Sequence, residues 1–476
     1  MRRRLHAGSL LWLLASILAC ASEGVRSGGS DAGAALPDSQ PGRVPERVVL
    51  ISVAGLQPAD YGVRDGALSL RSVLMPHLAE LARRGAYAEA VEPVLPAAPY
   101  PVHATLVTGL HPERHGLLGD EVLGRQGLDV SGIASAMRIR GIPLWRSVEA
   151  AGLPVASLNW PSTRGADITL LLPDLGVPRN GPDQRWLEDL QGEATPWVVE
   201  RLSRLDERLP ELHGPTTAER DSLVEGLACE IAKQPQTPAL WLLSFEQSGT
   251  AISRFGPGSE GAREGLAGVD ARIGRLLDCF EDAGIRDSTA WIVVGDRSFF
   301  PLHTVVYPNV ALERVGLITP SSVRGSGIAR WQAYVRSYGG AAVVYAETES
   351  DALLARRALE EQAERTGAFR VIPASQLESL HGDPNAWFGL QGELGYGIGK
   401  SARGLLLQAT QRRGLGGYLP TQSGSAVGFV AWGSGVRPGL RVPSLSQVDV
   451  APTAAQLLGV ELPGADGRPQ RGILGP

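Results

Sequence analysis

The segment LPAAPYPVHATLVTGLHPERHG, residues 95–116, carries side chains that could bind a cation. His111 and His115 have an i, i+4 spacing, which places two imidazoles on one face of a helix, where they can chelate a metal. Pro112 lies between them, however, and proline breaks the helix that such chelation needs. The spacing therefore does not predict a helical metal site.

The same segment has the layout of a catalytic loop, in which an apolar run follows a polar-capped turn and ends in Gly-Leu-His-Pro. Where such a loop would present a hydroxyl to a substrate, the chain has Ala97, Ala98 and Pro99. A hydroxyl nucleophile needs a base within reach, and no base with a suitable spacing accompanies the hydroxyls nearby. We therefore do not expect a replacement nucleophile among them. These hydroxyls belong to Tyr100, Thr105 and Thr108.

The elements that position these residues are predicted by the pattern of apolar runs. Short runs rich in Val, Ile and Leu, typical of buried strands, alternate with helical patterns. This alternation predicts an α/β fold with a doubly wound, mainly parallel sheet and helices on both faces. The predicted strands are 47–53, 153–160, 239–245, 289–295, 340–346 and 426–432.

Helices with terminal signals lie between and after these strands. Apolar residues follow helical spacing over 266–280. Thr216 and Glu219 form a capping box that opens another helix. A closing helix has Pro452 in its first turn and ends at Gly459.

Ligands of doubly wound sheets bind beyond the carboxyl ends of the strands. Functional residues are therefore sought directly after each predicted strand. The residues there are Ala54, Glu246 with the loop 247–253, and the pair Asp296 and Arg297.

Composition narrows the class of protein. The 476 residues include 43% hydrophobic and 20% charged side chains, as is typical of soluble globular proteins. The formal net charge is −5 and no long basic run occurs, so we expect no nucleic-acid partner.

The first residues, 1–20, read as a signal segment. Arg2 to Arg4 form a basic region, and the apolar stretch SLLWLLASILA is too short to span a bilayer with ease. The following ILAC resembles a bacterial lipobox, in which Cys20 would be lipidated. An ordinary secretory cleavage site around Cys20 is the alternative. We favour the lipoprotein, so the chain is expected to be exported and to contact a membrane through a lipid anchor only, or to be periplasmic or secreted if Cys20 is removed.

The remaining chain divides by composition. Residues 21–44 are small, polar and rich in Gly, Ser and Pro, which predicts a disordered tether. Residues 45–476 form the folded domain, with an insert around 300–415. Within it, Cys229 and Cys279 both fall in helical patterns. They could pair in an oxidising compartment, although two buried thiols are the interpretation that we favour.

Longer stretches of the chain resemble, in order, the type I phosphodiesterase/nucleotide pyrophosphatase family of the alkaline phosphatase superfamily. The matching stretches run from about residue 46 to 470 and include RVVLISVAGLQPADYG, PLWRSVEAAGLPVASLNWPS and VDARIGRLLDCFEDAGIRDSTAWIVVGDRS. The frames TLVTGLHPERHG and APTAAQLLGV are specific. The resemblance implies an alkaline phosphatase-like fold.

Active members of that family hold two zinc ions among aspartates and histidines, beside a threonine or serine nucleophile. Two cations activate the nucleophile and stabilise charge on the attacking and leaving oxygens of a phosphoryl transfer. Such a site needs carboxylate and imidazole ligands, since apolar groups cannot balance the charge of the metals.

When the family's site residues are carried over one by one, most of the matching positions in this chain hold side chains that cannot bind a metal or act as a nucleophile. The nucleophile position holds Pro99 and the neighbouring Asn position holds Val102, so no catalytic residue is implied. We expect neither a metal nor a zinc cofactor, because only Asp296 is retained. The metal-ligand positions hold Ala54, Gly249, Ser253, Asp296, Arg297 and Gly416. The remaining family-like histidines, interpreted as structural, are His103, His115 and His303.

The leading hypothesis is an exported pseudoenzyme of this family that binds an unidentified ligand or protein partner through a metal-free cleft. One alternative is an active phosphodiesterase or phosphatase, a hydrolase with an unrecognised site. Another is a structural subunit that pairs with an active paralogue.

Arg297 adds a charge where the family has a metal ligand, and two roles are open to it. It could form an ion pair with Asp296 that neutralises a buried charge. It could instead bind the phosphate or carboxylate of a ligand, because its planar fork suits bidentate contacts.

Overall fold

The structure is a computed structural model, and it describes residues 36–70, 73–124, 127–129, 133–174, 186–205, 215–321 and 328–475. The signal segment with Cys20, and most of the predicted tether, lie outside the described residues. Contacts divide the chain into Met1–Pro37 and Asp38–Pro476, and the second unit contains the fold described below.

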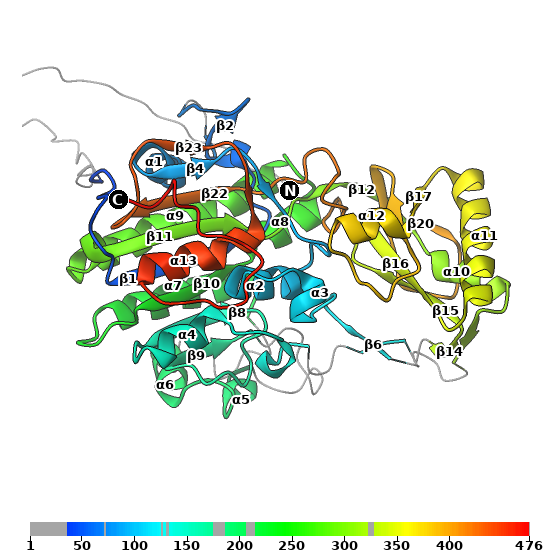
Figure 1. Ribbon diagram of the computed structural model, residues 1–476, viewed down its shortest axis with the longest axis horizontal. Coiled ribbons are helices and arrows are strands. Elements are labelled where there is room, and N and C mark those ends of the chain that lie inside the picture. Colours follow the sequence, from blue (N-terminus) through cyan, green and yellow to red (C-terminus); the bar gives the residue numbers. More distant parts are fainter. Residues whose placement is uncertain are drawn as a thin grey trace, which may run out of the picture. The chain divides into compact units, whose positions relative to one another are not determined.

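An eight-stranded sheet forms the centre of Asp38–Pro476 (Figure 1). Neighbouring strands are parallel except where β22 pairs with β11 and with β4. The sheet is therefore the mainly parallel one that the sequence predicts. In spatial order its strands are β23 (Leu440–Val442), β4 (Ala86–Ala88), β22 (Phe429–Gly433), β11 (Thr289–Gly295), β1 (Arg47–Val53), β10 (Leu240–Phe245), β8 (Val155–Trp160) and β9 (Leu170–Pro173).

Helices cover both faces of this sheet, because successive side chains of a strand point to opposite faces. On one face, Val48 and Leu50 of β1 share a core with α2 (Pro99–Thr108), α4 (Leu144–Ala150) and α13 (Val450–Leu458). The other face carries α1 (Pro76–Arg84), α7 (Thr217–Ala232), α8 (Gln247–Phe255) and α9 (Glu260–Asp282), which contact one another.

Aromatic packing on the second face ties α9 to the sheet. The ring of Phe280 lies 5.0 Å from that of Trp241 in β10 and 4.8 Å from that of Trp291 in β11. All three side chains are fully buried. Burial of aromatic rings is a large contribution to folding, so this contact fixes where α9 lies on the sheet.

The helix signals in the sequence are confirmed. Thr216 and Glu219 form both bonds of the capping box that opens α7. The helix predicted over 266–280 lies inside α9, and α13 ends at Gly459, whose φ of 66° is left-handed. Glycine adopts that conformation without the steric cost of a side chain.

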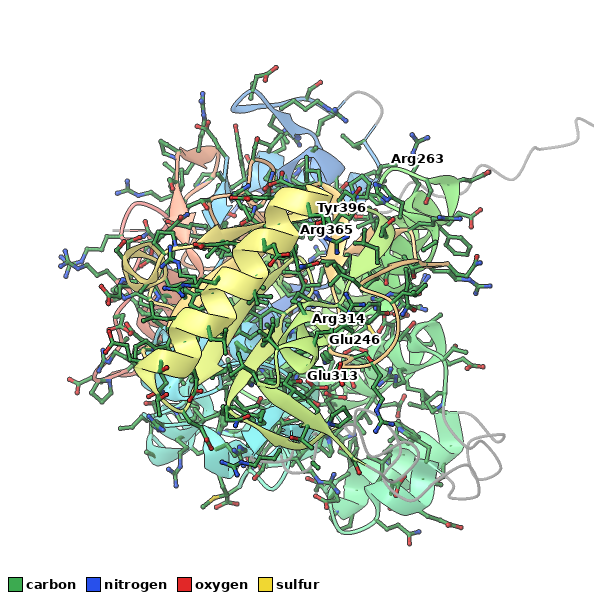
Figure 2. All side chains as sticks on the ribbon, turned by 90° about the vertical axis from the view of Figure 1, so that its right-hand side faces the viewer. Glu246, Arg263, Glu313, Arg314, Arg365 and Tyr396 are labelled. Atoms are coloured by element: carbon green, nitrogen blue, oxygen red, sulfur yellow. A yellow bond between two sulfur atoms is a disulfide. The ribbon has the colours of Figure 1, made fainter. Side chains whose placement is uncertain are left out.

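The strand predicted at 340–346 belongs to a different sheet. β16 (Ala341–Ala346) lies in an antiparallel sheet of order β15 (Ala333–Ser337), β16, β18 (Phe388–Gly392) and β17 (Phe369–Ile372). An apolar run predicts burial but not the neighbouring strand. α10 (Pro308–Arg314) and α11 (Glu349–Thr366) share a core with this sheet. In Figure 2, α11 crosses the side that faces the viewer.

The connections carry shorter elements. β12 (Phe300–Val306) follows the main sheet directly and pairs with β19 (Gly395–Ile398), β20 (Leu407–Ala409) and β21 (Gly414–Leu415). No helix in the described residues combines the length and apolar character needed to cross a membrane. The other helices and strands are β2 (Val63–Arg64), β3 (Ala67–Leu68), β5 (Val91–Glu92), α3 (Pro112–His115), β6 (Val122–Gly124), β7 (Gly127–Asp129), α5 (Trp186–Leu190), α6 (Pro196–Leu205), β13 (Ile318–Pro320), β14 (Ile328–Trp331), α12 (Ala374–Ser379) and β24 (Leu445–Ser446), besides short 3₁₀ turns.

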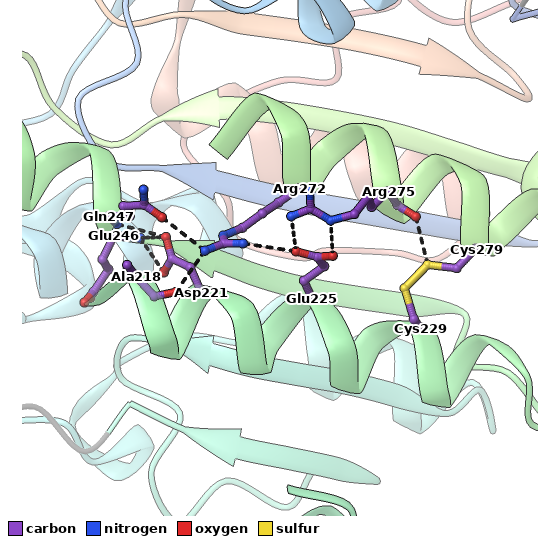
Figure 3. A network of polar contacts seen from close by, with 9 residues as sticks. All are labelled: Ala218, Asp221, Glu225, Cys229, Glu246, Gln247, Arg272, Arg275 and Cys279. Carbon is purple, nitrogen blue, oxygen red and sulfur yellow. Dashed lines mark hydrogen bonds and ion pairs between the residues drawn. A yellow bond between two sulfur atoms is a disulfide. The ribbon is translucent and has the colours of Figure 1, made fainter. Parts of the chain in front are cut away.

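A disulfide joins Cys229 of α7 to Cys279 of α9, with the two Cα atoms 5.6 Å apart (Figure 3). The interpretation of two buried thiols is therefore wrong. The two helices pack side by side and bring these positions into the range that a disulfide spans. Arg275 and Arg272 of α9 both bind Glu225 of α7 along the same seam.

Candidate functional site

A cavity of about 550 Å³ opens at the carboxyl ends of three neighbouring strands. Ala54 follows β1, Glu246 follows β10 and Asp296 follows β11, and all three line it. Parallel strands end at one edge of a sheet, so their following loops meet there.

The structure brings most of the sequence-predicted site positions to this cavity. Ala54, Pro99, Gly249, Ser253, Asp296 and Arg297 line it. Gly416 lines an adjacent cavity that shares Pro99 and Arg297 with the first. Val102 does not take part: its fully buried side chain lies in the core between α2 and the sheet. The resemblance places Val102 at the family's Asn position in the site, but here its side chain, three residues beyond Pro99, packs into the core.

Asp296 and Arg297, which both line the cavity, form an ion pair. The carboxylate of Asp296 also accepts the backbone N–H of Gly55 at 3.0 Å and that of Arg297 at 2.5 Å. Asp296 is 2% exposed, whereas 19% of the Arg297 side chain reaches solvent. Of the two roles considered for Arg297, the ion pair is therefore present.

The pairing does not use the whole guanidinium. Of the three guanidinium nitrogens of Arg297, only Nη1 is hydrogen-bonded within the described residues, and its partner is Asp296. The guanidinium also lies 5.1 Å from the ring centre of Phe299. Its Nε and Nη2 remain available to a ligand, so the ion pair and anion binding are compatible.

Small residues make room for this arrangement. A Cβ at Gly416 would lie 3.0 Å from Cδ of Arg297, so a larger residue there would crowd the arginine. A Cβ at Gly249 would lie 2.7 Å from the Cβ of Ala54. The two glycines therefore allow the arginine and the alanine to occupy the space.

Two more arginines line the cavity. Arg412 donates to the hydroxyl of Ser253 through Nη2 at 2.7 Å and through Nε at 3.1 Å. Arg254 is exposed and lies 5.0 Å over the ring of Phe255. The sequence did not indicate either residue, because Arg254 lies on the surface of α8 and Arg412 in a loop. Only the fold brings the two to one cavity.

Glu246, which also lines the cavity, belongs to a cluster of charged side chains. Glu246 pairs with Arg220 at 3.3 Å, and Arg220 also lies 3.9 Å from Asp174. The hydroxyl of Tyr100 donates to Asp174 at 3.0 Å, so Asp174 is the partner that the sequence did not reveal. Burial, with nearby Asp174, raises the pKa of Glu246 to about 7. Glu246 therefore changes charge near neutral pH.

Asp221 of α7 positions Glu246. Its carboxylate accepts the backbone N–H groups of Glu246 and Gln247 at the start of α8, as drawn in Figure 3. An acidic group at a helix N-terminus satisfies donors that the helix leaves free. Burial raises the pKa of Asp221 to about 6.

His103 lines the cavity together with Ser244, the penultimate residue of β10. Its Nε2 lies 3.4 Å from the hydroxyl oxygen of Ser244, and its Nδ1 lies 2.7 Å from the carbonyl oxygen of Pro99. The ring also packs edge-on against Trp160 at 4.9 Å. Burial lowers the pKa of His103. The imidazole is therefore neutral at neutral pH.

The other candidate residues have local partners. Thr105 donates to the carbonyl of Leu110 and Thr108 to that of Ala104. His115 lies 3.1 Å from Thr105, and His111 stacks on His381 at 3.9 Å. The last sequence candidate, His303, lies 2.9 Å from the hydroxyl of Thr304.

Comparison with known proteins identifies the fold and the lineage. The sequence model of the type I phosphodiesterase / nucleotide pyrophosphatase family matches residues 48–387. The chain belongs to that family. Human ectonucleotide pyrophosphatase/phosphodiesterase 5 superposes on 88% of this chain and 97% of its own length, with a TM-score of 0.62 at 17% identity. The murine protein of that name, in an inactive variant bound to AMP, gives the same TM-score.

Curated relatives of the type I phosphodiesterase/nucleotide pyrophosphatase family match at low identity. Human ectonucleotide pyrophosphatase/phosphodiesterase family member 1 is 23% identical over 234 residues. Venom phosphodiesterase from Naja atra is 25% identical over 244 residues. The matched region spans 21% and 25% of the length of these two proteins.

The zinc ions of active type I phosphodiesterases do not fit the residues present. Where the family has metal ligands, the cavity offers one carboxylate, Asp296, which is already bound by Arg297 and the backbone. A guanidinium carries a positive charge and has no lone pair for a metal. Among the described residues, no group of three or more His, Cys, Asp or Glu side chains is arranged to hold a metal ion.

Proposed function

We propose that this chain is a pseudoenzyme of its family that binds an anionic ligand in a metal-free cavity and does not hydrolyse phosphodiesters. The observation that carries the proposal is Arg297, which is bound to Asp296 but whose Nε and Nη2 have no hydrogen-bond partner among the described residues. Its cation stands where the metal charge of active relatives would stand, and Pro99 occupies the nucleophile position.

The charges of the cavity support an anion as its ligand. Arg254, Arg297 and Arg412 line the same space, and an arginine fork suits phosphate, sulfate or carboxylate. The AMP bound to the murine relative carries such a group. Without metal ions, these arginines would hold the ligand but would not activate a nucleophile against a phosphodiester.

Metal content and turnover test this proposal together. After incubation with zinc and dialysis, the purified protein is expected to retain far less than one zinc per chain by mass spectrometry. Hydrolysis of bis-p-nitrophenyl phosphate should stay at the uncatalysed rate, with or without a chelator. Stoichiometric zinc together with chelator-sensitive turnover would contradict the proposal.

Restoring two family residues should not restore activity. In the double variant Ala54→Asp, Arg297→His, the nucleophile position is still Pro99, and Gly249 and Ser253 still lack ligand groups. Residues that act as a unit lose function together, so no zinc-dependent phosphodiester turnover is expected. Measurable turnover in this variant, compared with the wild type in the same assay, would show that the missing groups are fewer than we infer.

Anion affinity should fall as pH rises through about 7. Below that pH, Glu246 is protonated, and above it the carboxylate adds a negative charge to the cavity wall. One extra charge about 8 Å from a divalent anion in a water-like dielectric costs about 1 kcal/mol, or roughly fivefold in affinity. Sulfate is the suitable probe for calorimetry because its charge is constant between pH 6 and 8. Glu246→Gln should remove the difference, and a pH-independent affinity in the wild type would contradict the assignment.

We also propose that the protein is exported and anchored through lipid at Cys20. The disulfide between Cys229 and Cys279 supports an oxidising compartment, because disulfides persist there and are rare in the cytosol. The lipobox-like ILAC sequence supports the anchor.

A further inference from the structure

Ser244, His103 and the backbone carbonyl of Pro99 form a chain of hydrogen-bonding groups that resembles a nucleophile, a base and an orienting group. The hydroxyl oxygen of Ser244 lies 3.4 Å from Nε2 of His103, and Nδ1 lies 2.7 Å from the carbonyl oxygen of Pro99. A carbonyl only accepts, so Nδ1 carries the proton in the neutral ring. Nε2 is then the acceptor that faces the serine hydroxyl.

The surroundings hold this pair in place. Ser244 lies near the end of β10 and is 2% exposed. His103 is 3% exposed, and its ring packs against Trp160. Both nevertheless line the cavity that also contains Arg297. A serine activated by a neutral histidine whose second nitrogen is fixed by a hydrogen bond is the arrangement of serine hydrolases.

We propose that Ser244 and His103 make this cavity a metal-free site for hydrolysis of carboxylic esters. Ser244 would be the nucleophile, His103 the general base and then the general acid, and the Pro99 carbonyl would position the imidazole. The cationic Nη2 of Arg297, which has no partner in the described residues, would face the carbonyl oxygen as negative charge develops.

The reaction balances with water as the only second reactant. Oγ of Ser244 bonds to the ester carbonyl carbon as its proton passes to Nε2 of His103. The C–O bond to the alcohol then breaks, and the leaving oxygen takes that proton, which leaves an acyl-serine. Water attacks the acyl carbon and gives a proton to Nε2. The C–Oγ bond breaks, the proton returns to Ser244, and a carboxylic acid is released.

The chemistry favours an acyl ester over a phosphodiester. A phosphodiester is anionic and repels an attacking oxygen unless cations neutralise both, a task that metal ions perform. An ester carbonyl is neutral and needs only a donor for the developing oxyanion. An ester with an anionic group elsewhere in the molecule would also match the arginines of the wall. The proposed ester hydrolysis does not depend on whether the protein hydrolyses phosphodiesters.

A labelling experiment on the purified full chain tests the assignment. A fluorophosphonate probe should label the wild type at Ser244, as located by peptide mass spectrometry, and p-nitrophenyl acetate should be hydrolysed in the presence of a chelator. Ser244→Ala should lose the label and at least about a hundredfold of the turnover. Thr250→Ala is the matched control, because Thr250 places another hydroxyl on the cavity wall and no histidine of the described residues is bonded to it. It should keep both signals.

The pH profile separates catalysis from a structural role of His103. Turnover should decline as pH falls and the imidazole is protonated, and this decline should occur below the pH at which an exposed histidine titrates, because burial lowers the pKa of His103. Absence of label and turnover in the wild type, a label on another residue, or equal turnover in Ser244→Ala would each overturn the proposal. Zinc content and sulfate affinity would be unaffected by that outcome.

Discussion

Arg297→Ala should destabilise the protein by roughly 3 kcal/mol, measured as the free energy of unfolding in urea. Removing the guanidinium leaves the carboxylate of Asp296 buried at 2% exposure without its charged partner, and breaking a buried ion pair costs about 3–5 kcal/mol. We expect the lower end of that range, because the backbone N–H groups of Gly55 and residue 297 still donate to the carboxylate.

Two further variants show whether the unpaired charge is the cause. Asp296→Asn combined with Arg297→Ala removes both charges and should recover most of the lost stability. Arg254→Ala removes an exposed arginine from the same cavity and should change stability by less than about 0.5 kcal/mol. If Arg297→Ala unfolds at the same urea concentration as the wild type, the ion pair contributes nothing and the inferred role of Arg297 is wrong.

Loss of the disulfide should produce an effect of similar size. Cys229 and Cys279 are 50 residues apart in sequence, and a loop of that length gives a chain-entropy stabilisation of about 4 kcal/mol. The double variant Cys229→Ser, Cys279→Ser should therefore unfold at a clearly lower urea concentration. The wild type under reducing conditions should behave like the variant, since both lack the cross-link.

Arg275→Ala is the matched control on the same pair of helices. It removes an exposed ion pair with Glu225, close to the disulfide, and such pairs contribute at most about 1 kcal/mol. Equal urea midpoints for oxidised and reduced wild type would mean that the cross-link does not stabilise the fold. They would also weaken the argument for an oxidising compartment.

The sequence alone determined the elements and the lineage of this protein. Continuous apolar runs located β1, β10 and β11, because these strands are buried on both faces, and helical spacing with terminal signals located α7, α9 and α13. Motifs with fixed spacing indicated the family, and the position of each loop after its strand indicated which residues lie at the same end of the sheet. Ala54, Gly249 and Asp296 are far apart in the chain, yet parallel strands carry them to one cavity.

Only the tertiary structure decided which side chains interact. The sequence left open whether Arg297 pairs with Asp296, and it did not indicate the contacts of Ser244 with His103 or of Tyr100 with Asp174. It favoured two thiols where α7 and α9 hold a disulfide. A repeat pattern reports how deeply a residue is buried, but a contact between distant residues depends on how helices pack on the sheet and on the rotamers that this packing permits.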